Sequence, residues 1–183
     1  AMMLAVSMMF LRFMILILIF STSIFLNIYP YLLIMSATAA GIGIFIHKKH
    51  TIKGEREVIE ETETDSNPLE FKVALIFALL FVVFTFLTHY TLVYAGTGGL
   101  SILSIATGLS DITPFILNLL QGGNIPATIV GACIMQAIIS NIVVNMFYAI
   151  FFSSRRKEML PYVWKGFLTV IGVNAVLLLI YYF

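Results

Sequence analysis

Charged side chains are scarce in this sequence: Asp, Glu, Lys and Arg make up 10% of its 183 residues, whereas hydrophobic residues make up 61%. A soluble domain is about one quarter charged, so an ordinary soluble globular protein is excluded. The apolar composition also excludes an intrinsically disordered chain. The formal net charge is only +1, which provides no basic surface, and we expect no nucleic-acid partner.

Residues that usually carry chemistry are also few. The one cysteine, Cys133, excludes a disulfide or a thiolate metal site within the chain. Only His89, among three histidines, lies inside an apolar segment, which is too little for a metal hydrolase or a nucleophile–base pair. Gly96-Thr97-Gly98-Gly99 lacks the lysine of a phosphate-binding loop. We therefore expect no enzymatic activity, no metal and no cofactor.

What the sequence does contain is a series of long apolar runs. A membrane-spanning helix needs about 20 such residues, and the chain has about six candidate segments. The sequence thus predicts an all-α, polytopic transmembrane helical bundle in contact with the lipid bilayer. A single domain is expected to cover 1–183, and apolar sequence already under way at residue 1 suggests a fragment or a missing upstream part. The predicted segments are 2–26, 31–46, 71–94, 100–120, 126–152 and 161–183.

Boundaries between these segments have recognisable signals. Asn27-Ile28-Tyr29-Pro30 predicts the first turn. Residues 47–66 hold most of the acidic side chains and cannot bury a core, so they are expected to form a polar, charged loop. Asn67 followed by Pro68 predicts the start of the third helix, because Asn caps helices and Pro suits the first helical position.

The fourth segment is expected to be broken or re-entrant. Pro114 removes a backbone donor and disfavours helix at Thr113, and Gly108 tolerates unusual dihedral angles. Two half-helices meeting at an unwound 108–113 stretch are predicted, with Thr113 capping the second. Unwound backbone at membrane depth occurs only inside protein or beside a water-filled cavity, and broken helices build transporter sites. The alternative is a proline-kinked structural helix.

Basic residues bear on the topology. One cluster lies between the second and third segments and another, Arg155-Arg156-Lys157, between the fifth and sixth. Cytoplasmic loops are enriched in Lys and Arg. These two loops fall on the same side only if the fourth segment is re-entrant, so the charge pattern favours re-entry.

The candidate site combines charged and polar residues at membrane depth. Asp111 and Arg12 are the deeply placed charges, and a bundle retains such costly residues for a reason. Arg12 is expected to reach Asp111 or the polar face of Asn141 and Asn145. The candidate ion- or solute-binding residues are Asp111, Ser110, Thr113, Asn141, Asn145 and Arg12.

Two of these predictions have simpler alternatives. The amides of the fifth segment could line a polar path or could only join helices by hydrogen bonds. His89 could relay protons or could be a packed residue near a helix end.

Several short motifs resemble a known family. They are Phe10-Leu11-Arg12, Asn67-Pro68-Leu69-Glu70, Gly108-Leu109-Ser110-Asp111 and Ser140-Asn141, and together they are similar to the uncharacterised prokaryotic integral membrane domain often found after MgtC-type (MgtC/SapB) segments. This resemblance implies a location in the inner (cytoplasmic) membrane and hints at ion homeostasis. The family tends to have a second acidic residue where this chain has Thr113, which puts in doubt any function that needs two carboxylates.

Two classes of function remain. The first is a small ion or solute translocator whose intramembrane polar site lies at the broken helix, assembled as a homo-oligomer or with a partner membrane subunit. The second is a non-transporting membrane subunit that assembles with or regulates another membrane protein. Six segments can hardly enclose a wide path alone, and transporter sites often lie between repeats.

Overall fold

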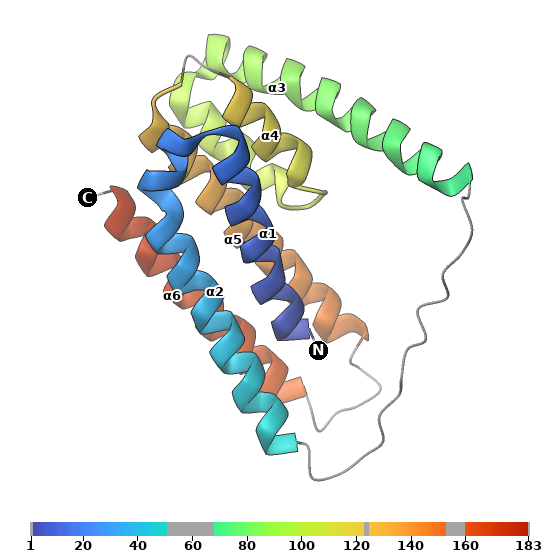
Figure 1. The fold of residues 1–183 in the computed structure, drawn as a ribbon, viewed down its shortest axis with the longest axis vertical. Helices are drawn as coiled ribbons and strands as arrows, with labels where there is room; N and C mark the ends of the chain where they lie inside the picture. Colours follow the sequence, from blue (N-terminus) through green and yellow to red (C-terminus); the bar gives the residue numbers. More distant parts are fainter. Residues whose placement is uncertain (1, 51–67, 123–124, 153–159, 183) are drawn as a thin grey trace.

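The computed structural model describes residues 2–50, 68–122, 125–152 and 160–182. These residues form an all-helical bundle without strands (Figure 1), which confirms the predicted fold class. The helices are α1 (Met2–Phe20), α2 (Thr22–His50), α3 (Pro68–Thr107), α4 (Thr113–Gln121), α5 (Ala127–Phe152) and α6 (Leu160–Tyr182). The last two lie close to the predicted fifth and sixth segments.

The first two helices form an antiparallel hairpin. They turn at Ser21, whose hydroxyl accepts a hydrogen bond from the backbone N–H of Ile24. The turn predicted at 27–30 is therefore wrong, and Pro30 lies inside α2. A proline within a membrane helix is tolerated because neighbouring groups can satisfy the freed carbonyl. Near the other end of the hairpin, the hydroxyls of Ser7 and Ser36 lie 3.4 Å apart.

The core of the bundle lies between α1, α2, α4 and α5. Buried residues recur every three or four positions, as expected for one face of a helix. In α1 they include Phe10, Phe13 and Ile17, and in α2 they include Ile28, Leu32 and Met35. The short α4 contributes Phe115, Ile116 and Leu119, and α5 contributes Ile134, Ile138 and Ile142. The hairpin of α1 and α2 lies against α4, α5 and α6 (Figure 1).

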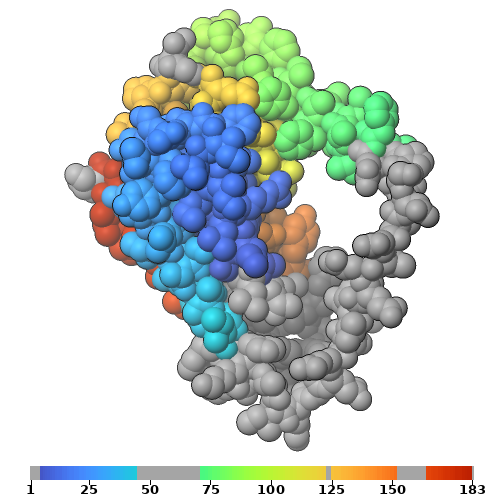
Figure 2. All heavy atoms as spheres, viewed as in Figure 1, coloured from blue at the N-terminus to red at the C-terminus, as the bar shows by residue number. Residues whose placement is uncertain are grey.

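Helix α3 has two parts joined by a kink at Gly96, whose φ of 59° favours glycine. The break predicted at 96–99 is thus a single non-helical residue. The outer part, 68–95, projects from the rest of the molecule (Figure 2) and exposes apolar side chains such as Phe71 and Tyr94. Pro68 is the first helical residue, as predicted, while Asn67 lies outside the described residues.

The inner part of α3, 97–107, and α4 form a helical hairpin. Helix α3 ends at Thr107, residues 108–112 are not helical, and α4 runs back beside the inner part (Figure 1). With nine residues, α4 is about 14 Å long, or about half of a 30 Å hydrocarbon core. The fourth segment is therefore broken at the predicted place, and neither half can cross a membrane alone.

In the described part of the chain, four helical ranges are long and apolar enough to span a membrane: Thr22–Ile44, Phe71–Thr107, Ala127–Phe151 and Trp164–Tyr182. The protein is accordingly a multi-pass membrane protein. The C-terminal ends of α2 and α5 and the start of α6 lie in the lower half of Figure 1, opposite the turn between α1 and α2. Helix α2 continues to His50, so 47–50 are helical rather than loop. The rest of the predicted loop, 51–66, lies outside the described residues.

Candidate functional site

Asp111 lies in the unwound stretch that joins the two half-helices. One oxygen of its carboxylate, Oδ1, accepts a hydrogen bond of 3.0 Å from the backbone N–H of Thr113, the first residue of α4. An acidic group is favourable at a helix N-terminus because the backbone N–H groups there lack helical partners. The capping position is occupied by Ile112, which has no side-chain capping bond. The expectation that Thr113 caps the helix is wrong, since Asp111 supplies the acceptor.

Arg12 meets this site from α1. Its guanidinium Nη2 donates a long hydrogen bond of 3.5 Å to Oγ1 of Thr113. Among the residues that the structure describes, Arg12 forms no ion pair with Asp111 and no hydrogen bond with Asn141 or Asn145. The predicted partners of the arginine are therefore wrong. Its hydrogen-bond partner is Thr113. The sequence predicts Thr113 as a candidate site residue but does not predict that it binds Arg12.

The turn after α3 packs directly on α5. A Cβ atom at Gly108 would collide with the Ser140 side chain and lie 2.8 Å from the backbone nitrogen of Asn141, so only glycine fits there. Ser140 donates from Oγ to the carbonyl of Ile105 at 2.6 Å. Asn141 donates from Nδ2 to the carbonyl of Gly108 at 3.3 Å. The bond from Asn141 satisfies a carbonyl just beyond the helix end, where helical partners are lacking. The bond from Ser140 adds a second donor to the carbonyl of Ile105, which also accepts from the backbone N–H of Gly108.

The remaining candidate residues extend this network. Asn145 donates from Nδ2 to Oδ1 of Asn141 at 3.0 Å, and Ser110 donates to the carbonyl of Thr107 at 3.2 Å. The amide of Asn141 is thus engaged at both ends. The structure brings Asp111, Thr113 and Arg12 into one cluster. Ser110 and Asn141 bond to backbone carbonyls of the same turn, and Asn145 reaches it only through the side chain of Asn141.

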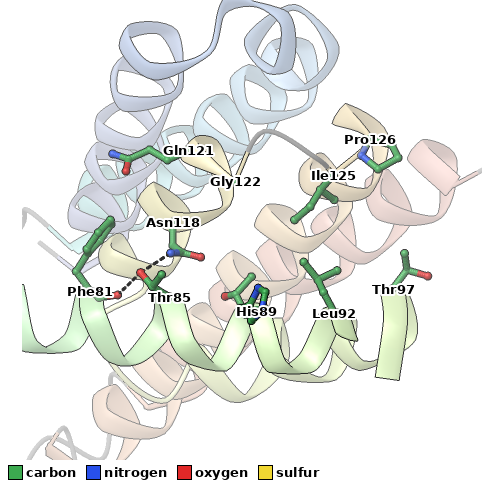
Figure 3. Close-up of a pocket in the computed structure, with 11 residues that line it drawn as sticks. Phe81, Thr85, His89, Leu92, Thr97, Asn118, Gln121, Gly122, Ile125 and Pro126 are labelled. Atoms are coloured by element: carbon green, nitrogen blue, oxygen red, sulfur yellow. Dashed lines mark hydrogen bonds between the residues drawn. The ribbon is translucent and has the colours of Figure 1, made fainter. Parts of the chain in front are cut away.

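His89 lies apart from this cluster. It lines a cavity of about 830 Å³ between the outer part of α3, the C-terminal end of α4 and the start of α5 (Figure 3). Leu92, Ile125 and Pro126 supply apolar walls, while the polar side chains are those of Thr85, Thr88, His89, Thr97, Asn118 and Gln121. The two ends of α4 therefore border two different polar regions, Asp111 at one end and this cavity at the other.

Asn118 is the residue of this cavity that sequence reasoning missed. Its Nδ2 donates to Oγ1 of Thr85 at 2.7 Å (Figure 3), and Thr85 in turn donates to the carbonyl of Phe81 at 2.8 Å. Phe115, one turn earlier on α4, meets Phe84 edge-on. The available signal was an amide side chain inside an apolar half-helix, since such residues face protein rather than lipid.

Thr88, another residue of this cavity, is 95% buried, and its Oγ1 has no hydrogen-bond partner.

Within the described ranges, no three His, Cys, Asp or Glu side chains gather closely enough to hold a metal ion.

Comparison with known proteins gives a family but no activity. An uncharacterised protein of Aquifex aeolicus (strain VF5) is 24% identical over 153 residues, which cover 82% of this chain and 63% of that relative. The chain thus spans less than two thirds of the relative's length. No solved structure matches. A family model described as "Domain of unknown function (DUF4010)" matches residues 1–153. The chain belongs to this family of uncharacterised domains.

Proposed function

We propose that this protein translocates a small ion or solute across the membrane, with its binding site at the break between α3 and α4. The observation that carries the proposal is the position of Asp111. It is an exposed carboxylate on a non-helical turn between two half-helices, each too short to cross a bilayer. Unwound backbone is tolerated at membrane depth where it lines a polar cavity, and discontinuous helices bind substrates in secondary transporters.

The surroundings of Asp111 fit a site that can open and close. Ser140 and Asn141 of α5 hold the end of α3 by hydrogen bonds, whereas a single bond of 3.5 Å joins the arginine of α1 to Thr113. Hydrogen bonds between membrane helices average only about 0.6 kcal/mol. Two bonds from α5 therefore support the turn, while one long bond links it to α1, and this difference suits alternate access to the carboxylate.

Flux through liposomes tests the proposal. The purified protein should raise the flux of protons, Na⁺, K⁺ or a small solute above that of protein-free liposomes. Asp111→Asn keeps the size of the side chain and removes its charge, and it should abolish this flux while the protein stays folded and monodisperse. Glu60→Gln is the matched control, because it makes the same change in the polar region 47–66. Equal flux in wild type and Asp111→Asn would disprove the role of Asp111.

A second candidate function has its own supporting observation. The outer part of α3 is apolar and exposed, with Phe71 74% and Tyr94 81% accessible. Lipid can cover such a surface, and so can another protein. A subunit that assembles with or regulates a second membrane protein, or pairs with its own copy, would use it. Co-purification of a stoichiometric partner together with no flux in any liposome experiment would favour this function.

The cellular setting is part of the same proposal. Residues of the motifs around Arg12, Asp111 and Asn141 resemble a prokaryotic inner-membrane family associated with MgtC-type segments. On that basis we place the protein in the cytoplasmic membrane and connect it with ion homeostasis. Fractionation of cells that express the protein, with detection in the inner-membrane fraction, tests the location.

A further inference from the structure

Arg12 and Asp111 have opposite charges and lie on either side of one residue without pairing. The guanidinium approaches Oγ1 of Thr113, and the carboxylate accepts from the backbone N–H of the same threonine. No ion pair joins the two side chains in the described part of the chain, so their charged atoms are more than 4.0 Å apart. Because both contacts end on Thr113, the distance between Nη2 of Arg12 and Oδ1 of Asp111 is at most about 10 Å.

Both charged groups have unused hydrogen-bonding capacity. A guanidinium has five N–H donors, and the structure gives Arg12 one long contact. A carboxylate offers about four acceptor positions, and Asp111 uses one of them. Both side chains are exposed. A ligand can therefore bind either group without first displacing a strong bond.

The geometry points to a zwitterion as the ligand of this site, and this inference rests on the proposed function. We propose that Arg12 binds the carboxylate and Asp111 the ammonium group of a small molecule that carries both, as α-amino acids do. The two charged groups of such a molecule lie a few ångströms apart. The molecule, with one hydrogen bond at each end, therefore fits between the guanidinium of Arg12 and the carboxylate of Asp111. Thr113 acts as the spacer between the charges.

Charge balance favours a zwitterion over a single ion. A cation at Asp111 would be repelled by the nearby guanidinium, and an anion at Arg12 would be repelled by the carboxylate. Either ion would also leave the loaded site with a net charge, which is costly in a medium of low dielectric constant. A zwitterion satisfies both residues and leaves the site neutral. Arginine is well suited to the carboxylate end because its planar fork binds two oxygens at once.

Calorimetric titration of the full chain in detergent tests this inference with matched probes. The probes are L-alanine, which carries both charges, ethylamine, which keeps only the ammonium group, and propionate, which keeps only the carboxylate. Wild-type protein should bind L-alanine at least tenfold more tightly than the other two. Arg12→Gln and Asp111→Asn should each weaken L-alanine binding at least tenfold. The order of the single ions should also change, with ethylamine favoured by Arg12→Gln and propionate by Asp111→Asn.

The control variant is Lys72→Gln, which removes a charge far from this site and should bind L-alanine as wild type does. Thermal melting of each variant shows that loss of binding is not loss of folding. Wild-type binding of ethylamine or propionate as tight as that of L-alanine, or unchanged L-alanine binding in Arg12→Gln, would overturn the inference. If that result is accompanied by flux that requires Asp111, only the ligand class is wrong. If there is neither binding nor flux, the proposed function is wrong as well.

Discussion

Asn141 of α5 donates a hydrogen bond from its side-chain amide to the backbone carbonyl of Gly108, the residue that follows the end of α3. The next N–H groups, of Leu109 and Ser110, return to carbonyls three residues earlier in tight turns. The end of the half-helix is thus completed partly by its own backbone and partly by a neighbouring helix. Asn141, one of the two amide residues expected to line the site, therefore supports its turn.

Gly108→Ala should destabilise the protein. The added methyl group would meet Ser140 and lie 2.8 Å from the backbone nitrogen of Asn141, and a backbone atom cannot move aside as a flexible side chain can. Overpacking of this kind costs about 1–3 kcal/mol. Thermal or denaturant unfolding in detergent would measure the loss.

The control for this prediction is Gly172→Ala in α6, where nothing lies within 4 Å of the new methyl group. Alanine is a better helix former than glycine by about 0.5–1 kcal/mol, so this variant should be as stable as wild type or slightly more stable. Equal stability of the two variants would contradict the close packing of the turn on α5.

Asn118 and Thr85 should show a measurable coupling energy. Their hydrogen bond of 2.7 Å joins α4 to the outer part of α3. Bonds between membrane helices contribute about 0.6 kcal/mol on average and up to about 1.7 kcal/mol. A double-mutant cycle with Asn118→Leu and Thr85→Val should give a coupling in this range. Additive single effects would mean that the bond contributes nothing. The pair Asn118→Leu and Thr169→Val is the control and should be additive, because the hydroxyl of Thr169 bonds within α6 to the carbonyl of Lys165.

Thr88→Val should leave the stability unchanged or raise it by about 1 kcal/mol. The hydroxyl of Thr88 is buried without a partner, and an unsatisfied buried group costs about 1–3 kcal/mol. Valine keeps the shape and removes the polar atom. The free energy of unfolding, measured for wild type and Thr88→Val, tests this prediction. A decrease of more than about 1 kcal/mol in Thr88→Val would mean that water or another group binds this hydroxyl.

Cysteine labelling should place the two charged loops on one side of the membrane. After replacement of Cys133, single cysteines at Glu60 and Ser154 should react with an impermeant reagent from the same side, expected to be cytoplasmic. A cysteine at Gln121, at the far end of α4, should react from the opposite side. The reason is that α4 returns toward the end of the molecule from which the inner part of α3 started (Figure 1). Labelling of Glu60 and Ser154 from opposite sides would mean that the 100–120 segment crosses completely.

Local sequence was enough to determine the class of the protein and the position of its broken helix. Charge at 10% and hydrophobic residues at 61% exclude a soluble fold, and long apolar runs require helices because lipid offers backbone groups no hydrogen bonds. Gly108 and Pro114 mark the break for a local reason as well. Proline restricts the residue before it and removes a donor, whatever surrounds it.

Local signals for a turn or a helix end gave the wrong boundaries of α2. Pro30 looks like a turn by itself, yet it lies within α2, and the hairpin turns at Ser21 instead. Serine is compatible with either state, and packing of the buried faces of α1 and α2 chooses between them. The inclusion of 47–50 in α2 likewise extends a helix beyond its apolar residues.

Only the tertiary structure decided which residues form the site. Arg12 and Thr113 are 101 positions apart in the sequence, and their contact depends on how α1 packs beside α4. The pairing expected from charge, Arg12 with Asp111, is replaced by two contacts to Thr113, because the N-terminus of α4 attracts the carboxylate. Sequence gives the kinds of groups that a membrane protein must bury or bind. Their partners depend on distances between helices, which no local propensity specifies.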